Sequence, residues 1–301
     1  MNTKNKAWAE RPFVVCTYGP SGIGKTTDMG YSFPRALFLA APGALISVES
    51  VCGYTPENGS VSTIKEATTI IEAAAGQYST VVIDDFSFLA EQTFSSLEKK
   101  YSGFRLWGEL RDSALEFRDK ARMSGVNVVM NCWEQGPKTK HDGSRVRGGP
   151  MLSGRLPEQI PALCDVVLRA VHEPKNRPWP AVYRCNADPS YVMKDRFHTS
   201  SLADPVPMNL AEILRSSGLH ILRHPDLPDQ EEKVEAIASS LSGDVKADTT
   251  LINEIYVSLV QSGQSVSVAR WTLRDALDRA VLRSAKSQAE NVFLASSTCL
   301  V

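Results

Sequence analysis

The feature that most constrains this chain is the stretch at residues 19–26, which reads GPSGIGKT. It matches the G-x-x-x-x-G-K-[ST] pattern of a phosphate-binding loop, follows an apolar run at residues 13–16, and precedes residues 27–31, which can form a helix. Glycines let backbone N–H groups approach a polyphosphate closely, and a helix N-terminus attracts the same anion. The stretch therefore predicts a strand, a phosphate-binding loop and a helix. A glycine-rich turn without a ligand is the alternative.

The residues of this loop have distinct expected roles. Lys25 is expected to reach the β- and γ-phosphates of ATP, and the hydroxyl of Thr26 is expected to ligate Mg²⁺. ATP and Mg²⁺ are therefore the cofactors that the loop predicts. The other residues expected to bind the nucleotide are Gly19, Pro20, Ser21, Gly22, Ile23, Gly24 and Thr27.

A second apolar run ends in two acids, because residues 80–85 read TVVIDD. An uninterrupted apolar run suits a strand of a parallel sheet that helices cover on both faces. We expect Asp84, at the carboxyl end of this strand, to hold Mg²⁺ through water. The alternative is that Asp84 and Asp85 cap a helix that begins near Phe86, because Asp favours the N-cap position.

Further apolar runs alternate with amphipathic stretches, which predicts an α/β fold with a mostly parallel sheet flanked by helices. Strands are expected at residues 36–40, 44–48, 126–131 and 165–170, and a hairpin from residues 181–184 and 191–193. Helices are expected at residues 63–75, from 86 towards 101, at 107–121, 153–163 and 209–217.

The strand expected at residues 126–131 is followed by polar side chains that extend past its carboxyl end. Ligands of doubly wound sheets bind at this edge. Asn131, Glu134 or Gln135 is therefore expected to sense the γ-phosphate or to orient water, and Asn131 is our candidate nucleotide-binding residue. A polar strand end without such a role is an equally good interpretation.

Residues 136–150 are a second candidate functional segment, because they are rich in Gly and Pro and lack an apolar period. Lys138, Lys140, Arg145 and Arg147 stand against a single acid, Asp142. A loop of this length without regular structure is uncommon unless it is functional or mobile. Its cations suit contacts with nucleic-acid phosphates, and its lack of aromatic residues argues against base stacking. A solvated surface loop is the alternative.

The composition changes at residues 224–229, which read HPDLPD and indicate a linker between a core at residues 1–222 and a helical region at residues 223–301. Helices are expected at residues 231–241, 251–261 and 266–293. The last two are arranged in sequence like a helix-turn-helix, but their arginines alternate with acids rather than forming one basic stripe. A small bundle that packs or self-associates is the preferred interpretation.

Bulk composition narrows the class of protein. The formal net charge is -1, so a nucleic-acid contact requires a local basic surface. The six cysteines, at positions 16, 52, 132, 164, 185 and 299, lack C-x-x-C spacing and suit buried free thiols in a reducing compartment. No apolar stretch reaches the ~20 residues of a membrane span, and residues 1–10 lack an apolar signal core. We therefore expect a cytoplasmic protein without membrane contact.

Together, these motifs resemble those of the RecA/Rad-type recombination ATPases, in particular the short phage-encoded, core-only members grouped with single-strand annealing proteins. The resemblance spans residues 11–198 and rests on the order of the phosphate loop, the Asp84 strand, the Asn131 strand, the basic loop and the trio of Lys194, Asp195 and Arg196. The stretches at residues 150–155 and 163–165 add to it. The resemblance implies a RecA-like P-loop core, with the C-terminal helices outside it.

By this resemblance, residues 138–149 form a DNA-binding loop for single-stranded DNA. Lys194 and Arg196 would reach the ATP of a neighbouring subunit and stabilise charge on its γ-phosphate. The resemblance therefore implies a filament or ring with ATP at each subunit interface. A single-strand-binding or replication protein is a further expected partner, and the cytoplasm of an infected host cell is the expected location.

One departure from the family pattern concerns the catalytic base. Such ATPases usually carry a glutamate just after the second strand, whereas this chain has Ala40, Ala41 and Pro42 there. Glu49 or Asp85 would then orient the attacking water, and we favour Glu49 because it follows the strand expected at residues 44–48. Slow hydrolysis, or an ATP-bound clamp that rarely turns over, is the alternative.

Three functions are compatible with these observations. The first is a Mg²⁺- and ATP-dependent RecA-like ATPase that binds single-stranded DNA in phage-type recombination, annealing or replication. The second is a ring helicase or a helicase-loading partner. The third is a nucleotide-gated interaction protein or phosphotransferase without DNA, for which the cations of the basic loop would be dispensable.

Overall fold

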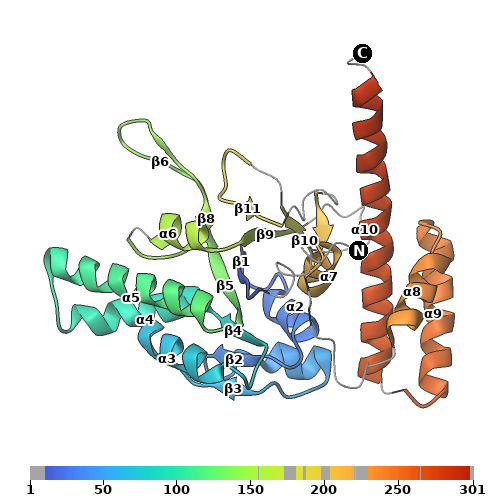
Figure 1. Ribbon diagram of the computed structural model, residues 1–301, viewed down its shortest axis with the longest axis horizontal. Coiled ribbons are helices and arrows are strands. Elements are labelled where there is room, and N and C mark those ends of the chain that lie inside the picture. The colour runs from blue at the N-terminus through green and yellow to red at the C-terminus, as the bar shows by residue number, and fades with distance from the viewer. Residues whose placement is uncertain are drawn as a thin grey trace.

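Ten strands form the central sheet in the computed structural model, which describes residues 11–154, 156–172, 181–185, 188–197, 204–219, 221, 230–264 and 266–298. The strands in the order β9-β1-β5-β4-β2-β3 run parallel (Figure 1). Their bounds are β1 Val14–Gly19, β2 Leu37–Ala40, β3 Asn58–Gly59, β4 Thr80–Asp84, β5 Asn127–Gln135 and β9 Val166–His172. The expected α/β class with a mostly parallel sheet is confirmed.

Helices cover both faces of this sheet, because successive side chains of its strands point to opposite sides. On β1, Val15 packs into one core, whereas Val14 and Cys16 pack into the other. The helices that bury residues in the first core are α2 Lys25–Ser32, α7 Leu210–Ser216 and α10 Val266–Thr298. Those of the second are α3 Ile64–Ala74, α4 Phe86–Glu98, α5 Gly103–Met123 and α6 Leu156–Leu163.

The segment expected as a strand at residues 44–48 is helical instead. A turn at Pro42 and Gly43 leads into the π-helix η2, Val48–Cys52. This helix packs on α2, where a side chain on Gly30 would meet Val48 at 2.7 Å and Cys52 at 3.0 Å. The prediction was wrong because Val48 packs against a neighbouring helix rather than a neighbouring strand, while Ile46 is exposed.

The prediction that residues 181–184 and 191–193 pair as a hairpin is also wrong. Strand β10, Ala181–Arg184, pairs antiparallel with β9 and with β12, Val206–Pro207. Tyr191 bridges to Gly148, and the next strand, β11 Lys194–Asp195, pairs with β9. Tyr183 is fully buried in the core beside α2, so packing across the sheet outweighs the local pairing that the sequence suggested.

The basic segment at residues 136–150 is not a structureless loop. Strands β6 Lys138–Thr139 and β7 Arg145–Val146 pair as an antiparallel hairpin, and β8 Gly149–Pro150 returns the chain to β5. The turn is closed by Asp142, which accepts hydrogen bonds from the backbone and hydroxyl of Ser144. Figure 1 shows this basic hairpin projecting from the carboxyl edge of the sheet.

The C-terminal helices form a bundle of their own. Helices α8 Gln230–Ser240 and α9 Val245–Gln261 share a small apolar core with α10. Trp271 of α10 also packs into the first core of the sheet, so this helix joins the bundle to the sheet. The linker expected at residues 224–229 lies outside the described residues.

Two expectations from composition can be compared with the structure. The cysteines at positions 16, 52, 132, 164 and 185 are buried and free, whereas Cys299 lies outside the described residues. In the part of the chain that the structure describes, no helix has both the length and the hydropathy of a membrane span.

Candidate nucleotide-binding site

The loop between β1 and α2 has the backbone conformation of an anion cradle. Gly22 and Gly24 have φ angles of 77° and 103°, values that favour glycine, and a Cβ on either would meet no atom within 4 Å. Gly24 is also the N-cap of α2 and offers no side-chain hydrogen bond to the helix. The first N–H groups of α2 are therefore without a side-chain cap at the end of the helix that attracts anions.

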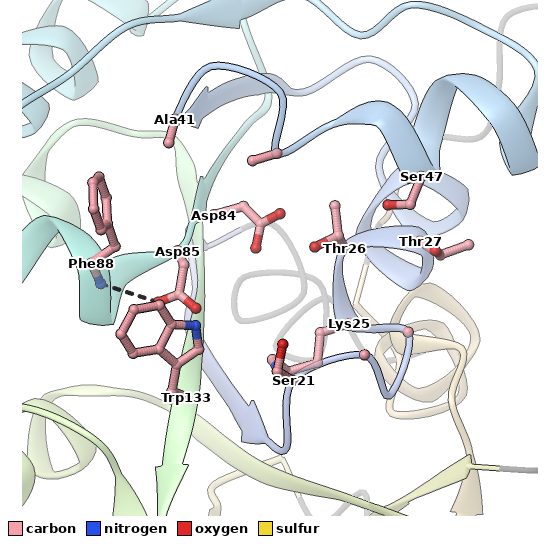
Figure 2. A pocket seen from close by; sticks show the side chains of 13 residues that line it. Ser21, Lys25, Thr26, Thr27, Ala41, Ser47, Asp84, Asp85, Phe88 and Trp133 are labelled. Atoms are coloured by element: carbon pink, nitrogen blue, oxygen red, sulfur yellow. Dashed lines mark hydrogen bonds between the residues drawn. The ribbon is translucent and has the colours of Figure 1, made fainter.

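A cavity of about 410 Å³ lies against this loop (Figure 2). Three parts of the chain enclose it: the loop with the start of α2, the turn after β2, and the carboxyl ends of β4 and β5 with the start of α4. The lining residues are Ser21, Gly22, Gly24, Lys25, Thr26, Thr27, Ala41, Ala44, Ser47, Asp84, Asp85, Phe88 and Trp133. Most of the expected loop residues are thus brought to one cavity, whereas Gly19, Pro20 and Ile23 do not line it.

The ammonium of Lys25 is held by the backbone at the start of the loop. Its Nζ donates hydrogen bonds to the carbonyl oxygens of Gly19 and Pro20, each at 2.9 Å. Burial lowers the pKa of Lys25, and the charges of Asp85 and Asp84 oppose that change. The loop therefore places a cation where the phosphates of a nucleotide would lie.

Asp84 has the features expected of a residue that holds a metal through water. It is 4% exposed, and its Oδ2 is buried without a hydrogen-bond partner. In Figure 2 the side chains of Asp84 and Thr26 point towards each other across the cavity. Burial raises the pKa of Asp84, and the neighbouring Thr26 and Asn131 side chains and the charge of Lys25 oppose that rise. An orphaned carboxylate oxygen beside a hydroxyl fits a hydrated Mg²⁺.

Asn131 does not line the cavity, which corrects its expected contact with the nucleotide. It is fully buried on β5, the strand between β1 and β4. Its Nδ2 donates to Asp84 Oδ1 at 2.9 Å, and its Oδ1 accepts from the Thr17 hydroxyl at 2.5 Å. Asn131 therefore orients Asp84 from behind.

Glu134 and Gln135, the two alternatives to Asn131, do not line the cavity either. Glu134 accepts two hydrogen bonds of 2.9 Å from Arg169, and Gln135 borders a different cleft. Trp133, between them in sequence, is the β5 residue that faces the cavity. The sequence predicts that a ligand binds at this end of the strand, but the polar residues there, and not the tryptophan, were the expected contacts.

Asp85 both caps a helix and lines the cavity. Its Oδ1 accepts the backbone N–H groups of Ser87 at 2.6 Å and Phe88 at 3.3 Å, so the N-cap interpretation holds for this residue. Burial, together with the charge of Asp84, raises the pKa of Asp85 to about 6, although these N–H groups and Lys25 oppose the rise. Asp85 is thus an unusually basic carboxylate at the cavity wall.

Glu49, the favoured candidate for the base, is not brought to this cavity. It lies exposed on η2, whereas Ala41, Ala44 and Ser47 of the same region line the wall. The preference for Glu49 depended on a strand that does not form. The contributions of Ala41, Ala44 and Phe88 were not anticipated, because small and apolar residues carry no chemical signal in a sequence.

The basic hairpin lies beside a second cleft, of about 700 Å³. Lys140, Arg145 and Arg147 line it together with Lys194, and Glu158 is the acid on its wall. Lys138, Lys140, Arg145 and Arg147 are all exposed. Arg147 donates to the carbonyl oxygens of Tyr191 and Asp188, which ties the base of the hairpin to the segment before β11.

Lys194 and Arg196 do not line the nucleotide cavity of their own chain. Lys194 donates to the carbonyl oxygen of Ala162 at 2.8 Å. Arg196 lies 3.2 Å from Asp165, which also pairs with Arg122 and accepts the backbone N–H of Val14. Arg196 is therefore at the start of β1, whereas the phosphate loop follows its end.

The chain matches a protein-family model and is similar to solved structures. Residues 11–197 match a family model described as an AAA domain. Among solved structures, the chain is similar to a KaiC-like protein of the archaeon Pyrococcus horikoshii, with 13% identity, a TM-score of 0.37, and 57% of this chain and 77% of that chain covered. It is similar to the RadB recombinase with 17% identity, a TM-score of 0.34, and 61% and 90% covered. No curated protein matches the sequence.

The Asn131 contact leads to a test of the metal site. In Asn131→Ala, Asp84 loses the donor to its Oδ1, so the buried carboxylate is less well oriented and more readily protonated. We expect the affinity for Mg²⁺ in the presence of ATP to fall about tenfold, as for other residues that orient a ligand from behind. Calorimetric titration measures this. Asn127→Ala, at the other end of β5, is the matched control, and an equal loss in both variants would contradict the assignment.

Proposed function

The chain belongs to the AAA domain family, and we propose that it is a Mg²⁺-dependent ATPase that binds single-stranded DNA. The observation that carries the proposal is the convergence on one cavity of Lys25, Thr26, the N-terminus of α2 and the unpartnered oxygen of Asp84. Cations, backbone N–H groups and a metal-holding carboxylate are together the groups that a nucleoside triphosphate requires.

Each group in the cavity has a part in the proposed chemistry. The backbone around Gly22 and Gly24 binds the phosphates, and Lys25 neutralises charge on the β- and γ-phosphates. Thr26 and Asp84 would hold the Mg²⁺, which when bound draws charge from the same phosphates. Asn131 keeps Asp84 in place, and Trp133 and Phe88 provide an apolar wall that limits the access of bulk water.

Asp85 replaces the missing glutamate as the general base in this proposal. It lies in the cavity wall, whereas Glu49 does not, and Ala41 stands near the position where the family glutamate is expected. A carboxylate with a pKa of about 6 is deprotonated at neutral pH and accepts a proton from water better than an ordinary aspartate.

The base assignment predicts a pH profile. Because the base acts when deprotonated, kcat/KM, which reports the pKa values of the free protein, should rise with pH through about 6 and level off above it. Asp85→Asn keeps an N-cap residue for α4 and should lower kcat about 100-fold or more, with loss of this pH dependence. Steady-state ATPase rates across pH measure both. Glu49→Gln should keep the wild-type profile, and loss of the profile in that variant instead would return the role to Glu49.

The basic hairpin is the proposed contact with single-stranded DNA. The chain enters it after β5 ends at Gln135, two residues beyond Trp133, so the strand that lines the nucleotide cavity continues towards the proposed DNA-binding segment. Its cations are exposed, and Lys140, Arg145 and Arg147 share a cleft with Lys194, which suits the phosphate backbone of a single strand. The net charge of -1 makes such a local surface necessary.

The hairpin predicts a salt-dependent DNA affinity. Replacing Lys138, Lys140 and Arg145 by Ala should weaken binding to single-stranded DNA and reduce the slope of log affinity against log salt by about 2, since each phosphate contact contributes about 0.7. Fluorescence anisotropy measures the slope. The exposed lysines Lys65, Lys233 and Lys246, replaced together, are the charge-matched control.

Measuring the ATPase rate with and without single-stranded DNA shows whether DNA binding by the hairpin affects hydrolysis. Stimulation in the wild type, lost in the hairpin variant, supports the proposal. No DNA effect on either binding or rate would favour a nucleotide-gated interaction protein. Strand separation of a forked duplex would favour a helicase, and copurification with a helicase would favour a loader.

We further propose that the protein assembles as a filament or ring with ATP between subunits, in recombination, annealing or replication of the phage type in the cytoplasm. Lys194 and Arg196 would then act on the ATP of a neighbouring subunit, which is compatible with their absence from their own cavity. A single-strand-binding or replication protein would be the partner.

The trans-acting role predicts a specific kinetic defect. Arg196→Ala should leave ATP affinity unchanged but lower kcat about 1000-fold, because such an arginine stabilises charge that develops on the γ-phosphate. Nucleotide binding and turnover are measured separately. Arg122→Ala removes the other cation that pairs with Asp165 and is the control for loss of that ion pair. Normal turnover by Arg196→Ala would rule the role out.

A further inference from the structure

A buried carboxylate on α2 is not explained by phosphate binding. Asp28 lies one helical turn after Lys25 and is only 2% exposed. Its Oδ2 accepts a hydrogen bond from the Tyr183 hydroxyl at 2.8 Å, and its Oδ1 accepts one from Arg274 Nη2 at 2.8 Å. A charge this deeply buried requires a fixed set of partners, because desolvation penalises it otherwise.

The cation that pairs with Asp28 comes from the C-terminal region. Arg274 is on α10, and its side chain is 24% exposed. It also donates to the carbonyl oxygen of Met208, lies 3.6 Å from Asp278, and stacks 4.4 Å from the ring centroid of Tyr31. Because Tyr31 is on α2, Arg274 holds that helix by both its carboxylate and its aromatic ring.

Further polar contacts join α10 to α7 and to α8 of the helical bundle. Asn209, the N-cap of α7, donates to Asp278 at 2.8 Å and to Asp275 at 3.1 Å. One turn further along α10, Arg279 pairs with Glu212 of α7 and Glu235 of α8. A chain of charged contacts thus leads from the phosphate-loop helix to α8.

Apolar contacts support the same junction. Trp271 of α10 meets the rings of Tyr31 and Tyr54 edge-on, at centroid distances of 5.9 Å and 5.8 Å. Tyr54 in turn donates to the carbonyl oxygen of Gly30. Asp28 and Tyr31 of α2 therefore contact α10 directly, and Gly30 contacts it through Tyr54.

We propose that Arg274 is a positioning residue for the nucleotide site, and that through Asp28 it couples nucleotide affinity to the position of the α8–α10 bundle. The inference rests on the nucleotide binding proposed above. Because α2 is short, a shift at Asp28 moves Lys25 and Thr26 with it. By linkage, a nucleotide that fixes α2 also fixes α10, and a partner that displaces the bundle weakens nucleotide binding by the same factor.

Substitution of Arg274 tests the coupling with a fluorescent, non-hydrolysable ATP analogue and Mg²⁺. Arg274→Gln should raise the Kd about tenfold. Arg270→Gln, an exposed arginine one turn earlier on the same helix, should leave the Kd unchanged. Because Arg274→Gln alone leaves Asp28 as an unpaired buried charge, Asp28→Asn/Arg274→Gln provides a neutral pair at the same positions. The double variant should also bind weakly, and wild-type affinity in it would overturn the proposal.

Hydrogen exchange on the unmodified protein separates this inference from the proposed function. With Mg²⁺ and the same analogue, exchange should slow in α2 and in the part of α10 around Arg274, but not in α5, which packs on the other face of the sheet. Protection of α2 without α10, or of all three helices equally, would overturn the coupling while nucleotide binding stood. Absence of protection in α2 would overturn the proposed nucleotide binding itself.

Discussion

The site depends on a line of hydrogen bonds that crosses three adjacent strands. The Thr17 hydroxyl on β1 donates to Asn131 on β5, and Asn131 donates to Asp84 on β4. All three residues are almost completely buried, so the Thr17 hydroxyl and the Asn131 amide make these hydrogen bonds rather than bonds to bulk water. The line keeps one oxygen of Asp84 occupied and directs the other to the cavity. Without it, the acid beside Thr26 would have no defined orientation.

Cations of the nucleotide cavity and of the second cleft differ in their partners. Lys25 and Lys194 donate to backbone carbonyl oxygens, so their charges are placed by the ends of a loop and of a helix. The cations of the basic hairpin are exposed, and those other than Arg147, which donates to carbonyl oxygens before β11, are placed by the pairing of β6 with β7. The first group is positioned before any ligand arrives, whereas the second remains adaptable. This difference suits a defined phosphate group in one case and a flexible backbone in the other.

Helix α2 connects these features because successive turns of it meet different environments. Its first turn carries Lys25 and Thr26 at the cavity, and its next turn carries Asp28, whose partners lie on β10 and α10. A short helix with polar groups fixed in its first turn and at Asp28 moves as one piece, because the packed interior around it transmits displacements. The C-terminal helix is therefore part of the support of the site, although it is the most distant element in the sequence.

The sequence by itself determined the phosphate loop, the β4 strand with Asp84 at its end, and the α/β class, because each depends on local spacing or on a long apolar run. Only the tertiary structure decided that Asn131 supports Asp84, that Asp85 rather than Glu49 reaches the cavity, and that Arg274 pairs with Asp28. The helical turn at residues 44–48 and the strand partner of β10 were missed for the same reason. Each of these outcomes is set by packing between segments far apart in the chain, and spacing within one segment carries no information about it.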